Sequence, residues 1–356
     1  MAQVIDREID MWFQNSAAQI QASVTLQAAE YQLTLTKPPG ALGALEYVAI
    51  TLAAHQGILK PALDKIFISV FAADHGVAKQ GVSAFPQAVT AEMIKNFASG
   101  GAAISVLAKQ LSAKFEVVNL GTVFHVPVHE KIIDAHIANG TADFCVQSAM
   151  SQDQLQQALA HGQQSAIRAK QSGSQLFIGG EMGIGNTTSA SALASAYLNI
   201  PAINMVGCGT GLDESKLPHK AQVIEQALAL HISRDPMDIL KNLGGFEIVA
   251  LVGAYIQCAQ QGITVLVDGF ISSTAALMAV AINESIRPWL MFSHESTEPG
   301  HRPILSELNA LPLLNIGMRL GEGSGAAVAV SLMQSAVVLH NQMATFEGAG
   351  VSEKEE

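Results

Sequence analysis

Five short apolar runs constrain the fold of this chain more than any other feature. They span 65–76, 115–123, 174–188, 262–270 and 289–297. Each ends in glycine or a polar cluster and is followed by a stretch with helical periodicity. Apolar runs without alternation are typical of strands buried on both faces, and strands that alternate with helices are typical of a parallel sheet. We therefore predict an α/β fold with a Rossmann-like, three-layer arrangement, in which a parallel sheet is flanked by helices.

The N-terminal part of the chain is organised differently. Residues 1–30 are polar and helix-prone, and Pro38, Pro39 and Gly40 break any helix in the following segment. Another helix is expected from Leu42 onwards. At the other end, the tail "GAGVSEKEE" is expected to be frayed.

Composition limits the possible partners. The chain has 356 residues, of which 49% are hydrophobic and 14% charged, so it can bury a large core, a broad subunit interface, or both. Its net charge is −11 without any Lys/Arg run, which argues against a nucleic-acid surface. An anionic substrate would have to be held locally by backbone N–H groups and one or two cations.

Several features indicate a soluble cytoplasmic protein. The N-terminus "MAQVIDREIDMWF" has charges where a secretion signal needs an apolar run. The most apolar region, 246–282, is interrupted by polar and charged residues, so no membrane span is predicted. Cys145, Cys208 and Cys258 form no CxxC pair and are interpreted as buried thiols of a reducing compartment rather than as a zinc site.

Polar clusters follow the predicted strands at their carboxyl ends, where ligands bind in parallel sheets. These clusters are Asp74–Gly76, Glu181–Gly183, Asp268–Gly269 and Ser293–Glu298. Their convergence at one edge of the sheet predicts a single site.

The stretch "GGEMGIGNTTSASALASA" is the strongest signal for phosphate binding. A predicted strand runs into glycines and then into a helix that starts at about 186–189. Glycines allow close approach of an anion, and a helix start offers free N–H groups. The pattern is neither a Walker loop nor a dinucleotide GxGxxG motif. A tight strand–helix turn without a ligand is the alternative.

A second glycine-rich turn, "GCGTGLDESKLPHK", contains one cation of interest. Asp213 is suited to cap the next helix, and Lys220 lies about two turns further on. Lys220 is either a solvated helix lysine or a partner of phosphate, and the second reading requires the two glycine-rich loops to meet.

The loop "ADHGVAKQGVSAFPQAVT" follows the first predicted strand. Asp74 and His75 fit either acid–base chemistry or a buried structural pair. Ser83, Phe85 and Pro86 are candidates for lining an apolar pocket that takes a flat ligand.

The stretch "FSHESTEPGH" contains two histidines and two glutamates. Their spacing matches no helix-borne metal motif such as HExxH, and Pro299 and Gly300 make it a loop. We interpret it as a substrate loop without a metal, with metal binding as the alternative.

The stretch "GMRLGEGSGAA" places a single acid, Glu322, between glycines and apolar residues. Desolvation disfavours the charged form of such a carboxylate, which raises its pKa and makes it a better base. The alternative is an acid that caps the helix expected to begin near Ser324.

A series of motifs carries a resemblance to one enzyme family. They are "TKPPGALGALE", "DHGVAKQGVSAFPQAVT", "GEMGIGNTTSASAL", "GTGLD", "DGFISSTAAL", "SHESTEPGH" and "GMRLGEGSGAA". In order and without large gaps, from about residue 30 to 345, the chain resembles the nicotinate-nucleotide:dimethylbenzimidazole phosphoribosyltransferases, which build the lower ligand of cobalamin. The resemblance implies a helical segment 1–40 in a small subdomain, a catalytic α/β domain 41–345 and a tail 346–356. It also implies a homodimer that needs no metal and no organic cofactor.

The family transfers ribose 5-phosphate from nicotinate mononucleotide to dimethylbenzimidazole, with inversion at the anomeric carbon. The resemblance implies that Glu322 is the catalytic general base. It further implies a set of substrate-binding residues: Ser83, Met318 and Leu320 around the benzimidazole, Glu181, Gly183, Gly185 and Lys220 around the nucleotide, and Asp268 and Ser296 close to it.

The chain departs from the family pattern at three alanines. Ala41 and Ala44 stand where many relatives have serine and arginine, and Ala91 stands where some have a glutamine beside the base ring. These departures leave open the fine contacts and the range of azoles accepted. Two other functions compete with the transferase: an N-glycoside hydrolase that handles nucleotides, and a non-catalytic protein that binds a phosphorylated ligand.

Overall fold

The computed structural model describes residues 11–209 and 211–352 and contains one parallel sheet. The strands run in the order β3-β2-β1-β4-β5-β6, the order of doubly wound nucleotide-binding folds. Their bounds are β1 (Ile66–Ala73), β2 (Lys114–Gly121), β3 (Ile132–Asp134), β4 (Leu176–Met182), β5 (Thr264–Val267) and β6 (Leu290–Phe292). The predicted α/β fold is therefore confirmed.

Side chains alternate between two cores along the central strand. Every residue of β1 is buried; Ile66, Ile68 and Val70 enter the core on one face of the sheet, and Phe67 and Phe71 enter the core on the other. A strand buried on both faces has no polar side to show, which explains why its sequence is continuously apolar.

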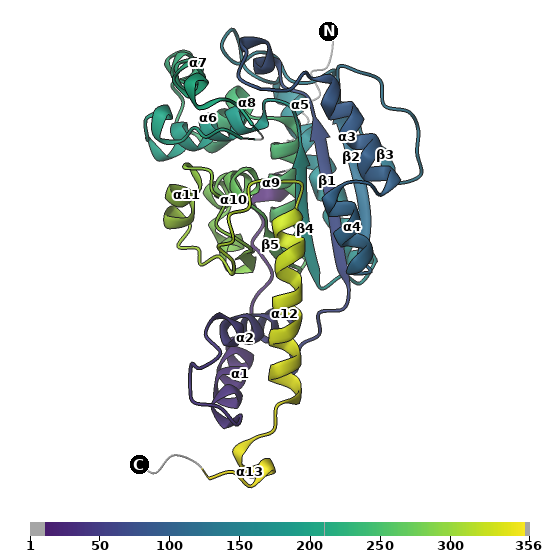
Figure 1. The fold of residues 1–356 in the computed structure, drawn as a ribbon, viewed down its shortest axis with the longest axis vertical. Helices are drawn as coiled ribbons and strands as arrows, with labels where there is room; N and C mark the ends of the chain where they lie inside the picture. Colours follow the sequence, from purple (N-terminus) through teal and green to yellow (C-terminus); the bar gives the residue numbers. More distant parts are fainter. Residues whose placement is uncertain (1–10, 210, 353–356) are drawn as a thin grey trace, which may run out of the picture.

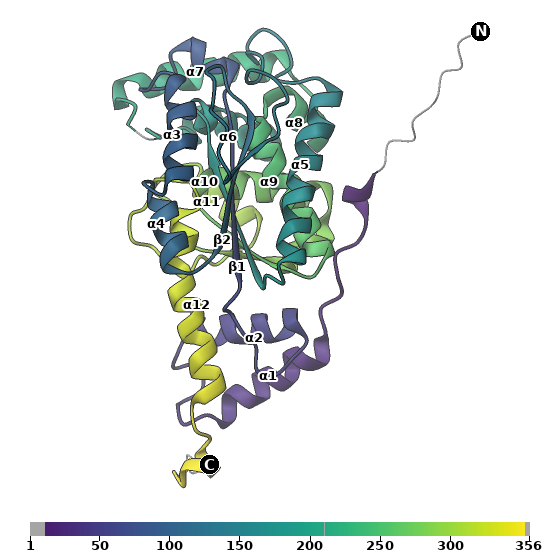
Figure 2. The same ribbon diagram turned by 90° about the vertical axis from the view of Figure 1, so that its right-hand side faces the viewer.

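Helices cover both faces of the sheet, as Figures 1 and 2 show. One face carries α3 (Ala88–Ser99), α4 (Ala103–Gln110) and α12 (Ser324–Gln342). The other face carries α5 (Gln152–Gln171), α6 (Asn186–Leu198), α7 (Leu217–Leu230), α8 (Pro236–Leu243), α9 (Phe246–Gln260) and α10 (Phe270–Ile282). The short helices α11 (His301–Glu307) and α13 (Phe346–Ala349) follow β6 and α12.

A small helical unit lies beyond the amino ends of the strands (Figures 1 and 2). It consists of α1 (Ala22–Thr34), α2 (Ala44–Gln56) and the C-terminal end of α12, where His340 Nδ1 lies 2.7 Å from Gln32 Nε2. The predicted turn after residue 36 separates α1 from α2. The division at residue 40 stays a prediction, and the first ten residues and the last four lie outside the described ranges.

One strand was not predicted. β3 has three residues, pairs only with β2 at the edge of the sheet, and has part-exposed side chains. It lacks the apolar run that marks the buried strands, so its sequence carries no signal. Within the described ranges, no helix has both the length and the hydropathy of a membrane span.

Candidate active site

A cavity of about 1130 Å³, counting space open to solvent, lies at the carboxyl ends of the strands. It occupies the point where the strand order reverses between β1 and β4, the usual ligand position in such sheets. Every residue to which the family resemblance gives a catalytic or substrate-binding role lines this cavity except Met318. The backbone carbonyl of Met318 instead accepts a hydrogen bond from Thr297 N–H at 3.2 Å. Pro86, a candidate for the apolar wall, also lies outside the lining.

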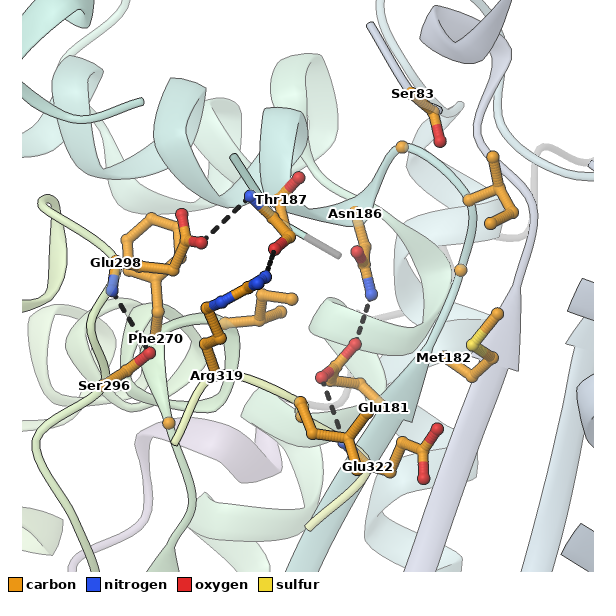
Figure 3. A pocket seen from close by; sticks show the side chains of 18 of the residues that line it. Ser83, Glu181, Met182, Asn186, Thr187, Phe270, Ser296, Glu298, Arg319 and Glu322 are labelled. Atoms are coloured by element: carbon orange, nitrogen blue, oxygen red, sulfur yellow. Dashed lines mark hydrogen bonds between the residues drawn. The ribbon is translucent and has the colours of Figure 1, made fainter. Parts of the chain in front are cut away.

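The cavity has two chemically different halves (Figure 3). Arg319, Glu298 and Ser296 lie on one side, and Ser83 and Met182 lie on the other. The lining residues on the Ser83 segment are mostly apolar: Val82, Ala84, Phe85, Val89 and Met93. The cations that line the cavity are Lys220 and Arg319. One end therefore suits an anionic group, and the other suits a flat apolar ring.

The loop between β4 and α6 forms the floor between these halves. Gly185 has φ +102°, a conformation that favours glycine, and α6 starts directly after it. The amide of Asn186 donates to the Glu181 carboxyl group, and Ile184 N–H donates to Thr90 Oγ1 at 3.2 Å. The predicted strand–glycine–helix turn is thus present, and it faces the cavity.

Lys220 is not a solvated helix lysine. It is 1% exposed, and its Nζ donates to Thr187 Oγ1 at 2.9 Å and to the Gly207 carbonyl at 3.2 Å. These bonds join the two glycine-rich loops, which is the condition that phosphate pairing required. Burial lowers the pKa of Lys220 to about 8, and the charge of Glu298 opposes that effect.

Glu322 lies two residues before the start of α12 in an unusual backbone conformation. Its φ is +66°, and its side chain is 7% exposed at the cavity wall. Its N–H points to Glu181 Oε1 at 3.4 Å (Figure 3). Burial, and then the charge of Asp268, raise the pKa of Glu322 to about 7. A carboxyl group with that pKa is suited to general base catalysis near neutral pH.

The residue that caps α12 is Asp268 rather than Glu322. Asp268 Oδ2 accepts a hydrogen bond from Gly323 N–H at 3.1 Å, and Oδ1 accepts one from Ala326 N–H at 2.8 Å. The capping alternative for Glu322 is therefore wrong, since a different acid satisfies the helix start. Asp268 fixes the backbone beside Glu322 as well as lining the cavity.

Glu181 is a second buried acid of the site. Burial, followed by the charges of Glu247 and Asp268, raises the pKa of Glu181 well above its ordinary value. This favours the neutral form, a carboxylic acid with one O–H group that is able to donate a hydrogen bond. Burial and the charge of Asp268 thus raise the pKa of both Glu181 and Glu322, and the charge of Glu247 adds to the effect at Glu181.

Asp74 and His75 have separate partners. Thr90 Oγ1 donates to Asp74 Oδ1 at 2.7 Å, and Val123 N–H donates to Asp74 Oδ2 at 2.9 Å. His75 Nε2 lies 2.7 Å from Glu247 Oε1, with both side chains fully buried. Both residues lie outside the cavity lining, so the structural interpretation fits them better than acid–base chemistry.

The loop 293–301 brings Ser296 and Glu298 to the cavity. His301 Nδ1 accepts a hydrogen bond from Ser296 N–H at 2.8 Å, which shapes the loop, and Glu298 Oε1 accepts one from Gly209 N–H at 2.9 Å. Within the described ranges, no group of His, Cys, Asp or Glu is placed to hold a metal ion.

Sequence reasoning assigned no role to three residues that line the cavity: Asn186, Thr187 and Arg319. His294, which lies in the predicted substrate loop, also lines it. The interpretation of Cys208 as a buried thiol was wrong, because it is only partly buried and lines the cavity. Asn186 and Thr187 occupy the helix start of the phosphate motif, which was a usable signal. Arg319 has no local signal, since its partner Gly209 is 110 residues away.

Gly180 on β4 sets the position of Glu322. A Cβ atom at Gly180 would overlap the backbone carbonyl of Glu322. We expect Gly180→Ala to displace the acid and to lower kcat/KM by roughly 10²-fold, the effect of about 1 Å of misplacement. Steady-state kinetics checks this. Gly101→Ala is the matched control, because its Cβ would meet only the movable side chain of Asn96. Equal activity of both variants would contradict the prediction.

A doubly wound sheet whose cavity combines a buried lysine, an apolar half and a buried acid defines a class of nucleotide-handling α/β enzymes. Residues 17–351 match a family described as phosphoribosyltransferase. The chain is 54% identical to the nicotinate-nucleotide:dimethylbenzimidazole phosphoribosyltransferase of Pseudomonas aeruginosa strain LESB58, covering 96% of this chain and 98% of that one. The enzyme of the same name from Pseudomonas putida strain W619 gives the same identity and coverage.

A solved structure agrees with these relatives. CobT from Thermus thermophilus superimposes with a TM-score of 0.90 at 41% identity, covering 93% of this chain and 100% of that chain. The chain belongs to the nicotinate-nucleotide:dimethylbenzimidazole phosphoribosyltransferase family. The resemblance seen in the sequence is thereby confirmed.

Proposed function

We propose that this chain transfers ribose 5-phosphate from nicotinate mononucleotide to dimethylbenzimidazole, giving α-ribazole 5′-phosphate and nicotinate. Family membership supports this, and the division of the cavity into a cationic half and an apolar half is the observation that carries it. The phosphorylated donor is assigned to the side of Lys220 and the azole to the side of Ser83.

Proton balance explains why one acid is enough. The azole loses its ring N–H proton to Glu322 while its other nitrogen forms the new bond to the anomeric carbon. The bond to nicotinate breaks, and its electron pair returns to the pyridine nitrogen, so the leaving group needs no proton. Attack from the face opposite the leaving group inverts the anomeric carbon. Glu322 then returns its proton to solvent.

This mechanism predicts a dependence on pH. A base acts in its unprotonated form, and the pKa of Glu322 is about 7. The kcat/KM for the azole should therefore rise with pH and level off above neutrality, and it should fall about tenfold for each pH unit below the pKa. A pH profile measures this, with the ionisation of the free azole determined separately. A flat profile between about pH 5.5 and 8.5 would contradict the assignment.

Incubation with nicotinate mononucleotide, with and without dimethylbenzimidazole, tests the function. The transferase releases nicotinate only with the azole and yields the α-riboside in equal amount. Release of nicotinate without the azole would favour the hydrolase, with Glu322 activating water. Binding without turnover would favour a non-catalytic binding protein.

We further propose that the protein is a cytoplasmic homodimer whose small helical unit is built on α1 and α2. Exposed apolar side chains on these helices, Leu26, Leu33 and Tyr47, support a subunit contact there. Sedimentation equilibrium of the full chain distinguishes a dimer from a monomer.

A further inference from the structure

The backbone of Gly209 is held on both sides by charged side chains from distant parts of the chain. Glu298 Oε1 accepts its N–H at 2.9 Å, and Arg319 Nη1 donates to its carbonyl at 2.6 Å. In Figure 3, Glu298 and Arg319 reach toward each other across the same end of the cavity. Charge-assisted bonds of this kind are about twice as strong as neutral ones.

The loop that contains Gly209 depends on these contacts for its shape. Gly209 has φ +54°, and residues 207–209 belong to no helix or strand. Lys220 holds the preceding carbonyl of Gly207, and a Cβ atom at Gly207 would overlap the Glu298 carboxyl group. Any anion that Lys220 binds therefore lies against a loop fixed by Glu298 and Arg319.

Arg319 also belongs to the segment that carries the acid of the site. It precedes Glu322 by three residues, and the far end of this segment is fixed where Gly323 N–H donates to Asp268. Between them, Gly321 has φ +84°, so the segment is irregular. The bond from Arg319 to Gly209 is thus a direct link between the loop beside Lys220 and the segment of Glu322.

We propose that Arg319 is a positioning residue which, through Gly209 and Glu298, couples occupation of the Lys220 side of the cavity to the placement of the Glu322 segment. This rests on the proposed function: the phosphorylated donor prepares the site for the azole. Linkage requires that the donor then tightens binding of the azole, and coupling of this kind is typically about 5-fold or more.

The test measures dissociation constants for dimethylbenzimidazole by titration, with and without saturating nicotinate mononucleotide. A Glu322→Gln background suppresses turnover during the titration. We expect the nucleotide to tighten azole binding about 5-fold in this background and to have almost no effect once Arg319→Met is added. Arg302→Met is the matched control and should retain the effect, since the Arg302 side chain is 80% exposed and, among the residues that the structure describes, hydrogen-bonds only to Glu295.

Glu298 supplies a second pair of variants. Glu298→Gln keeps an acceptor oxygen for Gly209 N–H and should retain the coupling, whereas Glu298→Ala should lose it. The proposal is overturned if the nucleotide still tightens azole binding after Arg319→Met is added. It is also overturned if the nucleotide does not tighten azole binding in the Glu322→Gln protein itself. Failure of the unsubstituted chain to make the α-riboside would instead refute the proposed function, so the two failures are distinguishable. Thermal melts confirm that each variant is folded.

Discussion

Glu322→Gln is expected to lower kcat by roughly 10²- to 10⁴-fold, the range for loss of a general base. Glutamine has the size of glutamate and fits the same backbone, but its amide cannot accept the proton of the azole. Folding should change little, because the raised pKa of Glu322 shows that its surroundings already tolerate a neutral side chain. Steady-state rates of α-riboside formation measure the effect.

Glu92→Gln is the matched control for that substitution. Glu92 is exposed on α3 and lies outside the cavity lining, so its loss should leave the rate unchanged. A fall of less than tenfold in Glu322→Gln would assign proton abstraction to another group.

Lys220→Met is expected to raise the KM for nicotinate mononucleotide by roughly 10- to 100-fold, since a hydrogen bond to a charged group contributes about 1.5–3 kcal/mol. Methionine fills most of the buried space and removes only the cation. The KM for the azole should change much less, because Lys220 lies in the cationic half of the cavity. Initial rates at varied nucleotide with saturating azole, and at varied azole with saturating nucleotide, give the two KM values.

Lys216→Met is the control that separates the loss of the buried Lys220 cation from the loss of one positive charge anywhere near the site. Lys216 precedes Lys220 by one turn and is exposed. Its substitution should leave the nucleotide KM within about twofold, because exposed charges are screened by solvent and salt. If Lys220→Met behaved in the same way, the phosphate would have to be held by other groups.

The sheet was predictable because a strand that is buried on both faces has a continuous apolar run in its sequence. Residues 66–73 are apolar almost throughout since each side chain enters a core. β3 could not be recognised in the sequence, because an edge strand with part-exposed side chains needs no apolar run. The position of the cavity followed from the rule that ligands bind at the carboxyl ends of parallel strands.

The chemistry of individual residues was less predictable, because it depends on contacts that are distant in sequence. A lysine in "LPHK" looks solvated, and only the packing of α7 against two loops buries Lys220. Asp268 appeared to be a ligand-binding acid, yet it also caps a helix that begins 56 residues later. The positive φ angles of Gly317 and Gly321 interrupt strand-like alternation, so neighbouring side chains around Met318 could not be assigned to the cavity from spacing.

At position 322 the backbone is left-handed, so the residue that would be best for folding stability differs from the residue that catalysis needs. A residue with a Cβ atom is destabilised by about 1–2 kcal/mol in that conformation, whereas glycine adopts it at almost no cost and asparagine tolerates it. Selection for thermal stability alone should therefore favour glycine at this position and give a protein that is more stable but has lost its activity. Persistence of glutamate there in laboratory evolution would report that turnover, and not robustness, was under selection.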